Sequence, residues 1–99
     1  MISLKPGVSI KGVSPELAFA LPIIASVFTK FDEELVITSV TDGKHGANSL
    51  HPKGQALDLR IRTLIGTNIE PIAQALRNAL GEEFDVLLEE DHIHIEHDC

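Results

Sequence analysis

A chain of 99 residues is the size of one domain, and a chain this short buries roughly 60 to 70% of the surface that its unfolded form exposes. The net charge of −7 argues against a nucleic-acid partner, which would require a basic surface to neutralise phosphates. The single cysteine, Cys99, cannot form an internal disulfide, and the longest apolar run, over residues 17–28, is too short to insert into a membrane.

The first predicted element is a helix that begins after Ser14. Ser14 is a suitable N-cap, Pro15 occupies the first helical position and Glu16 places an acid in the first turn. Pro22 is expected to kink this helix. Apolar residues recur at helical spacing over about four turns and predict its core-facing side: Leu17, Leu21, Ile24 and Phe28.

Two strands are predicted in the middle of the chain. The β-branched run 35–38 lies between turn residues and is typical of a buried strand. From 55 to 62 apolar and polar residues alternate, which predicts a strand with one apolar and one polar face. The polar face would carry Asp58, Arg60 and Arg62.

A second helix and two further strands are predicted after these. Thr67 or Asn68 can cap the helix, and Gly81 is its expected C-terminal stop. Strands are expected at 84–88 and 92–97, and the short connection between them requires an antiparallel hairpin. The order of elements predicts a single α+β domain over residues 1–99, with helices packed on one face of a mainly antiparallel sheet.

The five histidines lie in two short stretches. His45 and His51 precede the second strand, and the other three lie in the last one, where His92 and His94 share a face and His97 is expected to be solvated. Two histidines, one carboxylate and an open position for water form the ligand set of catalytic zinc. Each stretch alone is more often a solvated strand edge or a turn.

The two stretches together resemble the paired metal motifs of the D-alanyl-D-alanine carboxypeptidase family of zinc peptidases. The pattern is Ser49-x-His51-x-x-Gly54-x-Ala56-x-Asp58 followed by Asp91-His92-Ile93-His94. That family includes phage endolysin endopeptidases, and its fold is shared with the signalling domain of hedgehog proteins. The resemblance implies a hedgehog-like fold and hydrolysis of peptidoglycan stem peptides, as a carboxypeptidase or an L,D-endopeptidase.

The resemblance also implies how the site is built. Zinc would be held by His51, Asp58 and His94. Asp91, three positions before His94, would be the general base. His92 would lie beside the site, either to stabilise the oxyanion of the tetrahedral intermediate or to hydrogen-bond a ligand. A continuous strand would separate His51 from Asp58 by about 23 Å, so the turn residues between them must fold His51 back.

Three assignments are less specific. Arg60 would bind a substrate carboxylate, and Ser49 would be a hydroxyl beside the metal ligands. A shift of register by two residues is left open, because Glu89 stands three positions before His92 as Asp91 does before His94. In that case Glu89 would be the base and His92 the ligand.

Two alternatives have a different chemistry. One is a non-catalytic zinc-binding domain of the same fold, acting in binding or in virion structure. The other is an iron oxygenase with two histidines and one carboxylate, which would need a larger barrel than this chain can form.

The N-terminal residues lack the charged and apolar regions of a signal peptide. We expect a monomer that is made in the cytoplasm and acts on the cell wall after release or as part of a virion. A phage-encoded lysis enzyme would fit these expectations.

Overall fold

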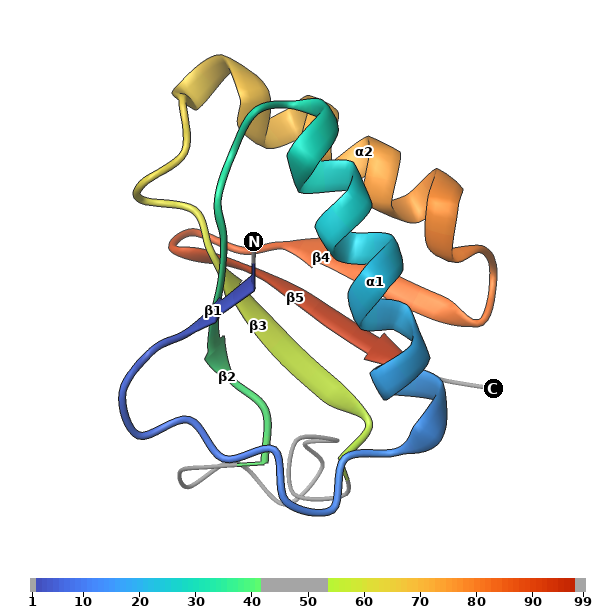
Figure 1. The fold of residues 1–99 in the computed structure, drawn as a ribbon. Coiled ribbons are helices and arrows are strands. Elements are labelled where there is room, and N and C mark those ends of the chain that lie inside the picture. Colours follow the sequence, from blue (N-terminus) through green and yellow to red (C-terminus); the bar gives the residue numbers. More distant parts are fainter. Residues whose placement is uncertain (1, 42–53, 98–99) are drawn as a thin grey trace.

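The computed structural model describes residues 2–41 and 54–97 and arranges them as two helices packed on a five-stranded sheet (Figure 1). The helices are α1 (Pro15–Lys30) and α2 (Gly66–Leu80). The strands are β1 (Ile2–Leu4), β2 (Leu35–Ser39), β3 (Ala56–Arg60), β4 (Phe84–Leu88) and β5 (His92–His97). None of the helices in these ranges is long and apolar enough to cross a membrane.

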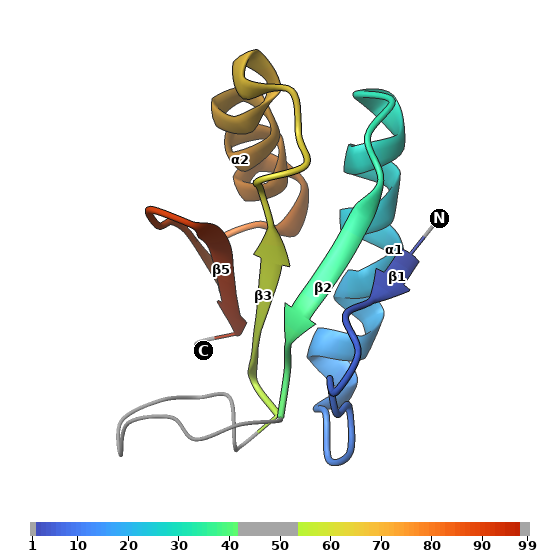
Figure 2. The same cartoon turned by 90° about the vertical axis from the view of Figure 1, so that its left-hand side faces the viewer.

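The strands lie in the order β1-β2-β3-β5-β4, and only β1 and β2 run parallel. Figure 2 shows β1, β2, β3 and β5 side by side in this order. The predicted α+β class with a mainly antiparallel sheet is therefore confirmed, as is the β4–β5 hairpin. The three-residue edge strand β1 was not predicted. Parallel neighbours need a long crossover connection, and α1 lies in the segment that joins β1 to β2.

Helix α1 begins where its sequence predicts. The Oγ of Ser14 accepts a hydrogen bond from the backbone N–H of Leu17 at 3.2 Å, which satisfies one of the free donors at the helix start. Three of the four expected core residues are fully buried, while Leu21 is half-buried. Pro22 lies inside the helix on its exposed side.

Helix α2 begins differently from the prediction. Its N-cap is Ile65, which forms no side-chain cap, so the expected caps Thr67 and Asn68 are wrong. The Oε2 of Glu33 instead accepts hydrogen bonds from the N–H of Ile65 at 2.8 Å and the side-chain amide of Asn68 at 3.0 Å. A carboxylate from the α1–β2 connection thus stabilises this helix end, where negative charge is favoured.

The end of α2 follows the prediction. Gly81 has φ +84°, a conformation that suits glycine, and its N–H donates to the carbonyl of Arg77 at 3.1 Å.

The alternation of β5 divides the sheet into a core face and an open face. Ile93 and Ile95 are completely buried in the hydrophobic core, while His92 and His94 lie half-buried on the opposite side, as predicted. The expectation that His97 is solvated is wrong, because alternation places it on the core face. It is only 5% exposed, and its ring packs on Phe84 with the centroids 4.9 Å apart.

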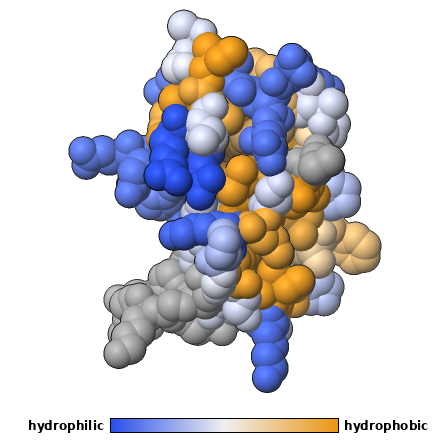
Figure 3. Space-filling model, turned by 60° about the vertical axis from the view of Figure 1, so that its left-hand side comes forward, coloured by the Kyte–Doolittle hydropathy of each residue, from blue (hydrophilic) through white to orange (hydrophobic). Residues whose placement is uncertain are grey.

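Apolar side chains also gather on the surface beside β1 (Figure 3). Ile2, Leu4 and Ile10 are exposed there, and they line a hollow of about 340 Å³ together with residues of α1. None of the described residues that line the hollow has a titratable side chain.

Candidate metal centre

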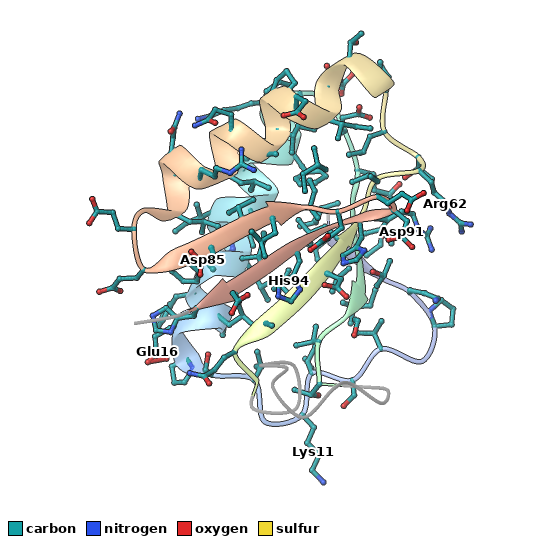
Figure 4. The ribbon with its side chains drawn as sticks, turned by 180° about the vertical axis from the view of Figure 1, so that it is seen from behind. Lys11, Glu16, Arg62, Asp85, Asp91 and His94 are labelled. Atoms are coloured by element: carbon teal, nitrogen blue, oxygen red, sulfur yellow. The ribbon has the colours of Figure 1, made fainter. Side chains whose placement is uncertain are left out.

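The register between β3 and β5 brings three candidate ligands to one place on the open face of the sheet. Asp58 is the direct partner of His94 across the two strands, and His92 is the next residue of β5 on the same face. Figure 4, which views the sheet from the side away from the helices, shows the His94 ring in front of β3 and β5.

Asp58, His92 and His94 could together hold a metal ion, because one possible ligand atom from each lies within 4.8 Å of the others. The Oδ1 of Asp58 is 2.9 Å from Nδ1 of His94 and 3.6 Å from Nε2 of His92. Neighbouring ligand atoms of a tetrahedral zinc ion, at bond lengths of about 2.0–2.1 Å, are separated by about 3.3 Å. The spacing therefore suits a small divalent ion.

The second nitrogen of each imidazole lies beside another carboxylate. Nδ1 of His92 is 2.6 Å from Oδ1 of Asp91, and Nε2 of His94 is 3.3 Å from Oε1 of Glu96. Metal-binding histidines commonly donate their second N–H to such a group, which fixes the tautomer and the ring orientation. Glu96 was not among the predicted site residues, although strand alternation places it on the same face as both histidines.

The electrostatics of the cluster favour a protonated His94 when no metal is bound. The hydrogen bond with Asp58 raises the pKa of His94 above its ordinary value, and partial burial opposes this. The hydrogen bond with His92 lowers the pKa of Asp91, so this exposed carboxyl stays ionised. Protons and a metal ion therefore compete for His94, because only the neutral imidazole binds metal.

The structure places some of the other predicted site residues and not all. His51 and Ser49 lie outside the described residues. The side chain of Asp91, directly before β5, is 87% exposed and contacts His92. Glu89 lies exposed in the hairpin connection, where its backbone N–H donates to the carbonyl of His92 at 2.8 Å.

A pocket of about 850 Å³ opens beside the cluster. Asp58 and His92 line it, as do the predicted carboxylate-binding residue Arg60 and the predicted base Asp91. Arg60 is the cross-strand partner of His92, so it lies on the same face. The cluster is thus accessible to a ligand of the size of a short peptide.

Comparison of the sequence with models of protein families and with curated proteins gives no match.

Proposed function

We propose that the chain is a zinc-dependent peptidase that hydrolyses peptide bonds in bacterial peptidoglycan stem peptides. The observation that carries the proposal is the convergence of Asp58 and His94, from two motifs far apart in the sequence, beside an open pocket. These are two of the three ligands that the resemblance to the D-alanyl-D-alanine carboxypeptidase family implies.

Zinc is the metal that best suits these donors. Two imidazoles and one carboxylate are typical of zinc sites, whereas calcium and magnesium prefer oxygen ligands alone. Iron also binds two histidines and one carboxylate, but the oxygenases that use this set are built on larger barrels. The small α+β domain therefore favours hydrolysis.

We assign the third protein ligand to His51, as the resemblance implies, and place His92 beside the position left for water. In support, Nε2 of His92 is farther from Asp58 than Nδ1 of His94 is, and the other nitrogen of His92 is held by Asp91. With Nδ1–H donated to Asp91, a ring that also carries a proton on Nε2 can donate a hydrogen bond to the oxyanion of a tetrahedral intermediate.

Bound zinc would supply a water of lowered pKa and polarise the scissile carbonyl. Asp91 would be the group that accepts a proton from the attacking water and passes it to the leaving amine. One oxygen of its carboxylate is engaged by His92, which leaves the second oxygen for this transfer. Of the two acids proposed from the sequence, Asp91 lines the pocket and Glu89 does not. This supports the assignment of Asp91 as the base and His94 as the ligand.

The substrate would reach the site with a free carboxylate facing Arg60. A guanidinium binds a carboxylate through two parallel hydrogen bonds, so it can fix the direction in which the peptide lies. Because this substrate is part of the bacterial cell wall, the enzyme would act after release from the cell or as a virion component.

A non-catalytic zinc-binding domain is the second candidate, and one observation favours it. Asp58, His92 and His94 already provide three donors, so the addition of His51 would give four protein ligands and no position for water. Such a closed site is typical of zinc that stabilises a fold.

The proposal is tested with the purified chain, synthetic stem peptides and mass spectrometry of the products. We expect hydrolysis that a chelator stops and added zinc restores, and no hydrolysis by the Asp58→Ala variant. A chain that carries zinc and leaves every stem peptide intact would support the second candidate.

A further inference from the structure

The pocket beside the metal cluster has a cationic wall. Among the lysines and arginines of residues 2–41 and 54–97, three line it, namely Lys5, Arg60 and Arg62. They come from two distant segments, since Lys5 directly follows β1 while the two arginines lie at the end of β3 and just beyond it. This concentration is unexpected in a chain whose net charge is −7.

Asp58, Glu90 and Asp91 line the same pocket, but no described carboxylate forms an ion pair with the cationic wall. In residues 2–41 and 54–97, none of the three side chains forms a hydrogen bond or an ion pair. Glu33 and Glu34 line an adjoining hollow with Lys5 and Arg60, but both carboxylates accept hydrogen bonds elsewhere. Neighbouring cations that have no ion-pair partner can bind an anionic ligand.

The position of the cationic wall determines how far a bound anion would lie from the metal cluster. Arg60 lies two residues beyond Asp58 on the same face of β3, which is about 7 Å of strand. Figure 4 shows Arg62 at the same end of the sheet as Asp91, farther along than His94. Glu90 and Asp91 line the pocket from the hairpin, and their charge directs an anion toward the arginines. An anion bound here lies about one or two peptide residues from the cluster.

We propose that Lys5, Arg60 and Arg62 form an anion-binding subsite that takes a dicarboxylate, such as an acidic amino acid with both of its carboxylates free. Arg60 alone suffices for one carboxylate, and Lys5 and Arg62 supply the charge for a second. Lys5 and Arg62 thereby become residues that determine specificity. The inference rests on the proposed function only in treating this ligand as part of a peptide substrate.

The test measures binding and needs no turnover. The protein as purified is titrated with N-acetylglutamate, N-acetylalanine and N-acetylalaninamide, which carry two, one and no carboxylates, and binding is followed by NMR. We expect affinity to fall in that order. Lys5→Gln and Arg62→Gln should each weaken N-acetylglutamate binding by about two- to five-fold, the effect of one exposed ion pair, and leave N-acetylalanine binding nearly unchanged.

Lys11→Gln is the matched control, because it removes the same charge from an exposed residue that lies far from Arg62 in Figure 4. It should bind all three probes as the parent does. Equal binding of the dicarboxylate and the neutral amide, or an equal loss in Lys11→Gln, would overturn the subsite. Neither result would contradict the peptidase proposal. Conversely, dicarboxylate binding as expected, without any hydrolysis of stem peptides, would contradict the peptidase proposal and leave the subsite in place.

Discussion

The Nδ1 atom of His94 lies 2.9 Å from Oδ1 of Asp58, although 36 positions separate the two residues in the sequence. The contact follows from the antiparallel pairing of β3 and β5, in which these residues are direct partners. Both side chains are less than one-fifth exposed. The two central residues of the candidate metal centre are therefore held by the most regular part of the sheet.

Removal of His94 should cost both metal and stability. We expect about one zinc ion per parent chain and much less in His94→Ala, because a small domain gains folding free energy from a bound metal. Elemental analysis measures the zinc, and thermal unfolding with and without chelator measures its effect. The chelator should lower the Tm of the parent and leave that of the variant unchanged. A variant with a full complement of zinc would show that the ligands lie elsewhere.

The third ligand is identified by two variants compared directly. His51→Ala should lose zinc, whereas His92→Ala should retain it and turn over stem peptides more slowly, because it loses a donor to the oxyanion. Zinc content and hydrolysis are measured on both. The opposite pattern would make His92 the third ligand. Loss of zinc from both variants would point to a closed site with four protein ligands and thus to the non-catalytic candidate.

Substitution of the proposed base should separate catalysis from metal binding. Asp91→Asn keeps the size of the side chain but cannot accept a proton, so turnover should fall by roughly 10²–10⁴-fold while zinc is retained. Glu89→Gln should be much milder, because Glu89 lies in the hairpin and outside the pocket. Steady-state rates and zinc content of the two variants show whether Asp91 or Glu89 is the base. If the site is shifted by two residues, the two variants will exchange their behaviour.

Substrate orientation should depend on Arg60. We expect Arg60→Ala to raise KM for peptides with a free carboxylate more than it lowers kcat, because the contact is present in the ground and transition states alike. Peptides whose carboxylate is amidated serve as the control and should be nearly unaffected. An equal loss with both kinds of peptide would assign Arg60 a structural role.

Glu33 should stabilise the fold without any part in the site. Glu33→Gln replaces the charged acceptor at the start of α2, and we expect a loss of about 1 kcal/mol in the free energy of unfolding. Denaturant unfolding measures this loss. Glu82→Gln removes the same charge from an exposed position and should be close to neutral. Similar values for the two variants would mean that the hydrogen bonds of Glu33 add nothing to stability.

Local signals in the sequence were sufficient for most elements. The cap at Ser14, the stop at Gly81 and the alternation around Ile93 each depend on residues a few positions apart, and the structure confirms all three. The α+β class follows from the order of these elements. The face shared by His92 and His94 is equally local, because side chains two positions apart on a strand point the same way.

Contacts between distant segments could be decided only by the tertiary structure. The capping of α2 by Glu33 and the pairing of β1 with β2 depend on how the helices and strands pack, which no local pattern encodes. The contact between Asp58 and His94 depends on the register of β3 against β5, and a shift of one residue would turn one of them into the core. The sequence supplied the candidate ligands, but burial of the apolar faces of these two strands fixed the register that brings them together.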